Sequence, residues 1–296
     1  MKVGIVGLGK MGLAIADRLR RASHEVDGYD PNQEAVEALE ALGGHGVSSL
    51  EELAKNVDVV WLMVPSGEIV DNSLFELKLH MKKKIIIDGG NSKYTNTIER
   101  AKKLADDHVS LLDCGTSGGL AGRDRGFCLM VGGDRASYDQ VEPILSAIAV
   151  PGGYAYVGPS GAGHYVKMIH NGIEYALLQS YGEGFNLLKN GVYKDLDLAT
   201  IANLWDHGSI IRSYILQLSH EILKKDSTLE KVSGTVADSG MGRWTVELAE
   251  KEDIPVPLIK QALEIRKESQ KTDGNYATKL VALLRNAFGG HSVEKK

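Results

Sequence analysis

The chain has 296 residues, of which 43% are hydrophobic and 25% charged, a composition typical of a globular protein long enough for two domains. Its 34 basic and 39 acidic residues give a net charge of -5, which argues against a protein built mainly to hold nucleic acid or an anionic membrane. Cys114 and Cys128 are too few for a disulfide framework, and no apolar run reaches the about 20 residues of a membrane span. We therefore expect a cytoplasmic protein.

Short strand-like runs alternate with helical periodicity through residues 1 to 158. KVGIVG precedes a helix expected from Met11, and HEVDGYD precedes one expected from Pro31. The runs DVVWLMV, KKIIIDGG and VSLLDCG follow, with helical stretches between them. This alternation predicts an α/β domain of the Rossmann type, doubly wound, with a mostly parallel sheet and helices on both faces.

Apolar residues recur at helical spacing through residues 159 to 296, with few strand-like runs. Helices are expected around residues 163 to 188, 210 to 223 and 258 to 265. The glycines and proline of GPSGAGH, residues 158 to 164, mark the boundary between the two domains. The second domain is predicted to be all-α and to end in the polar tail HSVEKK.

The motif GLGKMG, residues 7 to 12, follows a predicted strand and opens a predicted helix. In this arrangement Gly7 makes a tight turn, Gly9 lets the backbone approach a pyrophosphate, and Gly12 permits close packing of helix on strand. The N-terminus of the helix then binds the phosphates. The residues expected to bind the dinucleotide are Gly7, Leu8, Gly9, Lys10, Met11, Gly12, Asp30 and Val64.

Asp30 ends the second strand, eighteen residues after Gly12, where this motif places an acidic residue that bonds the ribose hydroxyls. No lysine or arginine occurs between Asp30 and Lys55 to receive a 2′-phosphate. The sequence therefore favours NAD over NADP as the cofactor.

The stretch KMIHNGIEY, residues 167 to 175, mixes reactive side chains with a helical apolar pattern. On one helix Lys167, His170, Asn171 and Glu174 share a face, with Lys167 and Glu174 about 10 Å apart along the axis. A lone lysine or histidine on a helix is usually a surface residue. Here apolar side chains flank the polar face on both sides, so its charged groups are expected to be partly buried. A lysine made neutral by partial burial can take a proton from an alcohol that loses hydride, and a carboxyl can handle a second proton.

Several other groups could bind an anion or a polyhydroxylated substrate. DGGNS, residues 88 to 92, and TSGG, residues 116 to 119, each follow a predicted strand, although turn formation alone explains either motif. Arg243, Arg266 and Arg285 lie among apolar residues, where arginines either snorkel to the surface or clamp a phosphate. No group of His, Asp and Glu has metal-ligand spacing, so no metal is predicted.

Taken in order, GLGKMG, IIDGGNS, SGG, GAGHYVKMIHNGIEY, SIIRS, GMGRWT and RNAFGGH resemble the 6-phosphogluconate dehydrogenase family from end to end. The resemblance implies oxidative decarboxylation of 6-phosphogluconate to ribulose 5-phosphate and CO2, without a metal. It implies that Lys167 is the general base at the C3 hydroxyl and that Glu174 assists protonation of C1 of the enediol intermediate that remains after CO2 has left. The substrate-binding positions that it implies are Asn91, Ser117, Gly118, Gly119, His170, Asn171, Tyr175, Arg243, Arg266, Arg285 and His291. It implies that Asn91 also binds the dinucleotide, near the nicotinamide.

In that family Arg285 and His291 would come from the tail of a neighbouring subunit, which implies a homodimer or homotetramer. The sequence departs from the family pattern in three ways. Asp30 stands where NADP-dependent members carry asparagine followed by arginine, Arg243 stands where a lysine is usual, and the helical part is shorter than in the long form.

Two alternatives are weighed against this interpretation. A β-hydroxyacid dehydrogenase of the 3-hydroxyisobutyrate kind would oxidise without loss of CO2, but Glu174 and the arginines of the phosphate end speak against it. A non-catalytic module that senses NAD is disfavoured by the presence of both Lys167 and Glu174.

Overall fold

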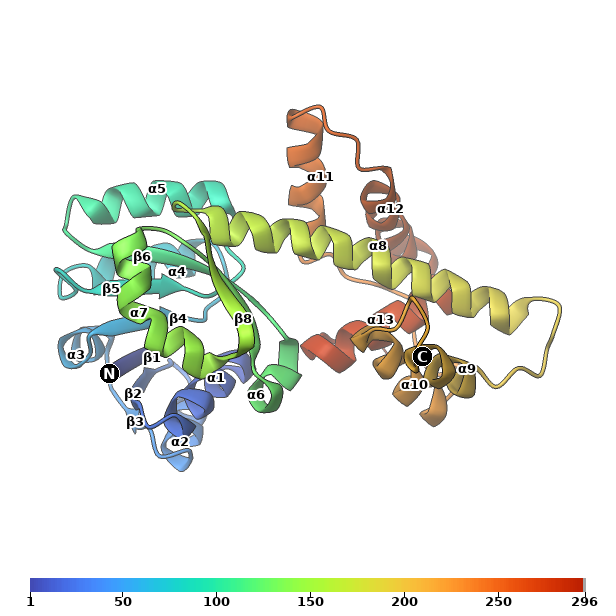
Figure 1. Cartoon of the computed structure of the whole chain (residues 1–296), viewed down its shortest axis with the longest axis horizontal. Coiled ribbons are helices and arrows are strands. Elements are labelled where there is room, and N and C mark those ends of the chain that lie inside the picture. The colour runs from blue at the N-terminus through green and yellow to red at the C-terminus, as the bar shows by residue number, and fades with distance from the viewer. Residues whose placement is uncertain (295–296) are drawn as a thin grey trace. The chain divides into compact units, whose positions relative to one another are not determined.

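Strands alternate with helices in the first part of the chain and helices alone make up the rest, in the computed structural model of residues 1–294 (Figure 1). The chain divides into two units, one ending at Lys167 and the next beginning at Met168. This division lies inside one long helix, α8 (Ala162–Asn190), further along than the glycine-rich segment from which the boundary was predicted.

The first unit contains one eight-stranded sheet of order β3-β2-β1-β4-β5-β6-β7-β8. Neighbouring strands are parallel except for β6 and β7, so the mostly parallel sheet is confirmed. The strands are β1 (Lys2–Val6), β2 (Glu25–Tyr29), β3 (His45–Gly46), β4 (Val59–Leu62), β5 (Ile85–Asp88), β6 (Ser110–Ser117), β7 (Phe127–Gly132) and β8 (Ala149–Gly158).

Helices cover both faces of this sheet because alternate strand residues point to opposite sides. Val59 and Trp61 of β4 lie in the core shared with α1, α2 and α7, whereas Val60 and Leu62 lie in the core shared with α3, α4 and α5. The helices are α1 (Lys10–Arg21), α2 (Gln33–Ala41), α3 (Leu50–Asn56), α4 (Glu68–Leu77), α5 (Tyr94–Ala105), α6 (Gly122–Arg125) and α7 (Arg135–Ile148), with a 3-10 turn, η1, at Gly119–Ala121.

The order of the strands reverses between β1 and β4, which are adjacent in the sheet. In open α/β sheets the crevice beyond the carboxyl ends of the strands at such a point is where ligands bind. Gly7 follows β1 and Val64 lies shortly after β4, so two of the residues expected to bind the dinucleotide lie at this edge.

The second unit is helical, as predicted. Its main core joins Leu178 and Phe185 of α8 to side chains of three other helices, and a smaller cluster joins Tyr175 of α8 to α11 and α12. The further helices are α9 (Leu198–Asp206), α10 (Tyr214–Lys225), α11 (Met241–Lys251), α12 (Pro257–Thr272) and α13 (Tyr276–Gly289).

Helix α10 begins four residues later than the expected start at residue 210. The hydroxyl of Ser213 accepts a hydrogen bond from the backbone N–H of Leu216, and such a cap fixes the first turn at that point. Within residues 1–294, no helix has the length and apolar character that crossing a membrane requires.

Candidate functional site

The glycine turn after β1 has the geometry expected of a dinucleotide-binding loop. Gly7 has a φ of 90°, and a Cβ there would lie 2.4 Å from the carbonyl oxygen of Met63. A Cβ at Gly12 would lie 1.9 Å from the carbonyl oxygen of Gly7, so both positions require glycine. At Gly9 an added Cβ would meet no atom of the described chain within 4 Å. This open space fits the close approach of a pyrophosphate.

The N-terminus of α1 is suited to an anion. Gly9 is its N-cap, and within the described residues the first turn has neither a capping side chain nor an acidic residue. The unpaired N–H groups and the helix dipole therefore favour a phosphate there. Lys10 is exposed at the start of α1 and Met11 is half-buried, whereas the Leu8 side chain is buried in the core, so Leu8 offers only its backbone.

Asp30 is fixed beside this turn at the end of β2. Its Oδ2 accepts a hydrogen bond from the backbone N–H of Leu8 at 2.8 Å, and its Oδ1 accepts one from Asn32 at 2.8 Å. The carboxylate thus links the second strand to the glycine turn. It places a negative charge where the sequence predicted a contact with the ribose.

Two loops of the first unit carry further predicted site residues. In the loop after β5 the buried Asp88 carboxylate accepts bonds from Gly90 N–H and Ser92 O–H, and Asn91 is exposed between them. A Cβ at Gly90 would lie 3.0 Å from the carbonyl oxygen of Val64, so the loops after β4 and β5 are adjacent. The geometry therefore brings Val64 and Asn91 to the same edge of the sheet.

The loop that contains Ser117, Gly118 and Gly119 follows β6. Gly118 and Gly119 have φ values of 127° and 56°, which glycine adopts without strain. The short helix α6 that follows is held to α1, because Arg123 donates from Nε to the Asp17 carboxylate at 2.7 Å.

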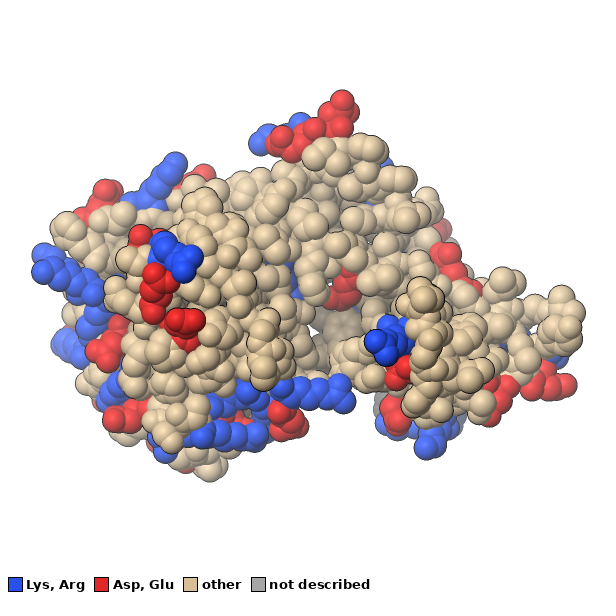
Figure 2. All heavy atoms as spheres, in the orientation of Figure 1, with Lys and Arg blue, Asp and Glu red and all other residues tan. Residues whose placement is uncertain are grey.

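Lys and Arg side chains gather over this part of the first unit in the view of Figure 2. The arginines of α1 and α6 are Arg18, Arg20, Arg21, Arg123 and Arg125.

Lys167 lies in the second turn of α8 and is only 6% exposed. A Cβ added to Gly115 of β6 would lie 2.4 Å from the Cβ of Lys167. The lysine stem is therefore packed directly against the strand that leads to Ser117, and a larger residue at position 115 would displace it.

Helix α8 is continuous from Ala162 to Asn190, so it contains the whole predicted stripe. His170, Asn171 and Glu174 are half-buried, and His170 Nδ1 lies 3.0 Å from Asn171 Oδ1. At 3.6 residues per turn these side chains share a face with Lys167. The apolar residues Ile173 and Leu177 remain 51% and 46% exposed.

A cationic cluster lies in the second unit around Tyr175. The guanidinium carbon of Arg266 is 3.2 Å from the centroid of the Tyr175 ring, and the Tyr175 hydroxyl donates to Asp238 Oδ1 at 2.9 Å. Arg266 is 2% exposed, and burial lowers its pKa to about 10. Neither of its Nη atoms has a hydrogen-bond partner within the described residues. Two buried donor nitrogens of a cation therefore have no hydrogen-bond acceptor within the described residues.

Arg285 and His291 belong to the same cluster. Burial lowers the pKa of Arg285. The pKa of His291 falls to about 4, because of burial and then because of the positive charges of Arg285 and Arg266. The resemblance placed Arg285 and His291 at a neighbouring subunit's site, but in this chain both lie near Arg266 of their own helical unit.

Arg243 lines a pocket of about 550 Å³ in the second unit. Its Nε lies 3.7 Å from Asp238 Oδ2, and Lys267 lines the same pocket. Sequence reasoning missed Asp238 and Lys267. Asp238 directly precedes SGMGRWT, so its position beside that motif was the available signal, whereas Lys267 has none beyond being next to Arg266.

The fold and these groups define a dinucleotide-binding oxidoreductase with a helical second unit. A family model described as the NAD binding domain of 6-phosphogluconate dehydrogenase matches residues 2–158, and the model of the C-terminal domain of that enzyme matches residues 163–296. The chain therefore belongs to the 6-phosphogluconate dehydrogenase family, as its motifs predicted.

Relatives agree with this assignment. An NAD(+)-dependent, decarboxylating 6-phosphogluconate dehydrogenase of Haloferax volcanii is 43% identical over 100% of this chain and 99% of its own length. Plasmodium falciparum 6-phosphogluconate dehydrogenase, whose cofactor is NADP+, is 31% identical in sequence to this chain. Its structure matches with a TM-score of 0.84, over 92% of this chain and 63% of that chain. A 3-hydroxyisobutyrate dehydrogenase of Salmonella typhimurium shares the fold at 22% identity and a TM-score of 0.79, over 95% and 99% of the two chains.

Proposed function

We propose that the chain oxidises and decarboxylates 6-phosphogluconate to ribulose 5-phosphate and CO2 with reduction of NAD. One observation carries the proposal: α8 presents an amine, Lys167, and a carboxyl, Glu174, two turns apart on one helix face. The cationic cluster around Arg266 supplies a binding place for the phosphate of the same substrate. The Haloferax volcanii protein, similar over its whole length, bears the name of this activity.

The bound nicotinamide supplies the hydride acceptor, and the chain's own residues manage the protons. The Lys167 amine takes the proton of the C3 hydroxyl as that carbon becomes a ketone. The resulting 3-keto acid loses CO2 from C1, and Lys167 returns its proton to the ketone oxygen so that an enediol forms. Glu174 then assists protonation of the carbon that carried the carboxylate, while the Lys167 amine takes the proton of the hydroxyl on the former C3, so that the ketone of ribulose 5-phosphate forms. Asn91, His170 and Asn171 would orient the substrate between these groups.

The phosphate end of the substrate would lie on Arg266 and Arg285. Arginine offers planar, paired donors that match phosphate oxygens, and the unpartnered Nη atoms of Arg266 are buried donors of this kind. Tyr175 would hold the Arg266 guanidinium by its ring, and His291 and Arg243 would complete the phosphate set.

NAD is the proposed cofactor rather than NADP. Asp30 presents a carboxylate, held by two backbone N–H groups, at the end of β2. The same carboxylate bonds ribose hydroxyls and repels a 2′-phosphate. The residues between Asp30 and Lys55 include no lysine or arginine that would offset this repulsion.

The working unit is proposed to be a homodimer or homotetramer. Ile173, Leu177 and Leu187 lie on one side of α8 and are 51%, 46% and 73% exposed in the single chain. Large apolar side chains aligned on one helix are typical of a surface covered by a second subunit.

A coupled assay tests the proposed function. Purified protein with NAD and 6-phosphogluconate should form NADH and release CO2 in equal amounts. Turnover of 3-hydroxyisobutyrate without CO2, and none of 6-phosphogluconate, would assign the chain to the β-hydroxyacid dehydrogenases instead. Tight NADH binding with no turnover of either substrate would indicate a sensing module.

A further inference from the structure

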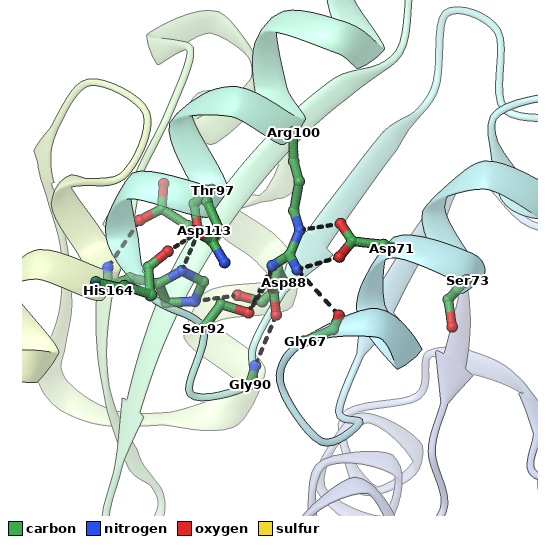
Figure 3. Close-up of polar contacts among 12 residues, drawn as sticks. Gly67, Asp71, Ser73, Asp88, Gly90, Ser92, Thr97, Arg100, Asp113 and His164 are labelled. Carbon is green, nitrogen blue, oxygen red and sulfur yellow. Dashed lines mark hydrogen bonds and ion pairs between the residues drawn. The ribbon is translucent and has the colours of Figure 1, made fainter. Parts of the chain in front are cut away.

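A buried polar network surrounds the first turn of α8 in the first unit (Figure 3). Asp113 of β6 accepts a hydrogen bond from Gly161 N–H at 2.7 Å through Oδ1, and one from His164 N–H at 2.8 Å through Oδ2. A strand residue therefore caps the helix that carries Lys167. A carboxylate at this end of a helix is also stabilised by the helix dipole.

The His164 side chain, 1% exposed, joins this helix turn to two other elements. Its Nε2 lies 3.1 Å from the carbonyl oxygen of Asp88, and its Nδ1 lies 2.8 Å from the hydroxyl of Thr97 on α5. Because a carbonyl oxygen can only accept, Nε2 carries the proton and donates it to Asp88. Nδ1 then accepts from the Thr97 hydroxyl.

Asp88 is in turn the anchor of the loop that carries Asn91. Its side chain holds Gly90 and Ser92, and Arg100 donates from Nη1 to Ser92 Oγ at 3.2 Å. Figure 3 shows Arg100 between this loop and Asp71, whose carboxylate it also meets with two hydrogen bonds. The loop is thus bonded on both sides of its exposed tip.

The backbone of this first turn has little room to shift. A Cβ at Gly163 would lie 2.4 Å from the carbonyl oxygens of both Asp113 and Met130. One turn further on, the Lys167 stem is packed against Gly115 with similar closeness. The position of Lys167 therefore depends on how the turn at residues 161–164 is held.

We propose that His164 is a positioning residue, which in its Nε2–H form fastens α8 to the loop after β5 and so fixes Lys167 relative to Asn91. The inference rests on the proposed function, in which Lys167 is the base and Asn91 contacts substrate and nicotinamide. A base displaced by about 1 Å loses on the order of a hundredfold in rate, so a bond that prevents such movement has a measurable kinetic effect.

Substitution of Thr97 tests the network with the smallest change to the structure. Thr97→Val keeps the shape of the side chain and removes the hydroxyl that bonds Nδ1, whereas Thr97→Ser keeps the hydroxyl. We expect Thr97→Val to lower kcat with 6-phosphogluconate about tenfold, with the KM for NAD within about twofold of wild type. The deuterium isotope effect for substrate labelled at C3 should rise, because hydride transfer becomes more rate-limiting. Thr97→Ser should restore both values.

Leu104→Ala is the matched control, since Leu104 is a buried residue of the same helix outside the network. It should lower the Tm and leave kcat and the isotope effect unchanged at temperatures well below the transition. Wild-type values in Thr97→Val, or the same kinetic change in Leu104→Ala, would overturn the proposal.

Nitrogen NMR of the histidine rings separates this inference from the proposed function, because it needs no turnover. The His164 ring should carry its proton on Nε2, and the Nδ1 resonance should shift in Thr97→Val. These results together with no turnover of 6-phosphogluconate would reject the proposed function while supporting the tautomer and the bridge. A proton on Nδ1 of His164 would reject the positioning proposal even in an active enzyme.

Discussion

Replacing Asp30 by asparagine should shift the enzyme's preference from NAD towards NADP. Asparagine retains one side-chain oxygen, so it can still accept the bond from Leu8 N–H that the aspartate accepts at 2.8 Å, whereas the bond from Asn32 N–H is lost. The substitution removes the negative charge with little change in shape. Binding of NAD should weaken because a charge-assisted bond to the ribose is lost, and binding of NADP should improve because a like charge is removed.

The size of the shift follows from these two contributions. A hydrogen bond to a charged group contributes about 1.5–3 kcal/mol. Repulsion between unit charges about 5 Å apart at this half-exposed position is on the order of 1–3 kcal/mol, with an effective dielectric constant between those of protein and water. Allowing for partial compensation by solvent, we expect about 3 kcal/mol in all, which is about a hundredfold change in the ratio of kcat/KM for the two cofactors.

The assay is initial-rate kinetics with 6-phosphogluconate at saturation and each cofactor varied. Asp134→Asn is a matched control, because Asp134 caps α7 in the same unit by accepting from Ser137 N–H at 2.8 Å. That control should leave the ratio unchanged. A ratio within about twofold of wild type in Asp30→Asn, with turnover retained, would refute the reasoning.

Three further predictions concern the cationic cluster. His291 should titrate near pH 4 by NMR, and its pKa should rise when 6-phosphogluconate is added. Because the pKa in the folded protein lies below the ordinary 6.5, the free energy of unfolding should fall as the pH drops from 6.5 towards 4. This fall should be less steep in His291→Asn. Arg266→Met should raise the free energy of unfolding by about 1 kcal/mol, because it removes a buried cation whose Nη atoms have no hydrogen-bond partner within the described residues. It should also raise the KM for 6-phosphogluconate at least about tenfold, and a lower Tm would contradict the reasoning. Arg285 lies near Arg266 of its own chain, so equal mixtures of refolded Lys167→Ala and Arg285→Ala chains should stay inactive. Recovery of about a quarter of wild-type activity would show instead that Arg285 acts in the neighbouring subunit.

The features that the sequence predicted well depend on local chain geometry. Gly7 and Gly12 must be glycine because a Cβ at either position would collide with nearby backbone. This requirement produces a glycine motif of fixed spacing, GLGKMG, that can be recognised in the sequence. The stripe from Lys167 to Glu174 follows from helical periodicity over a few residues, and the structure has one unbroken helix there.

The features that were missed join residues far apart in the chain. Asp113 caps α8 from 48 residues away, and His164 bonds Thr97 across 67 residues. Tyr175 meets Asp238 across 63 residues. Hydrophobic periodicity does not indicate contacts between residues so far apart in the chain. From the sequence, His164 was therefore only a residue of the motif GAGHYVKMIHNGIEY.

In the structure the division between the two units lies nine residues further along the chain than the predicted boundary at residue 158. The glycines and proline around residue 159 end β8, but the first turns of α8 still pack on the sheet through Gly163 and Lys167. A helix that begins in one unit and continues into the next shows no break in composition where the packing changes.

The central claim is that the Lys167 amine takes the substrate proton, and a single-turnover experiment tests it most directly. Lys167→Met keeps the stem that packs on Gly115 and removes the amine. With enzyme in excess over 6-phosphogluconate and NAD saturating, NADH formation followed by absorbance should be slower than in wild type by about a thousandfold or more, while the Kd for NAD stays within about twofold. A burst of NADH at the wild-type rate would show that another group is the base.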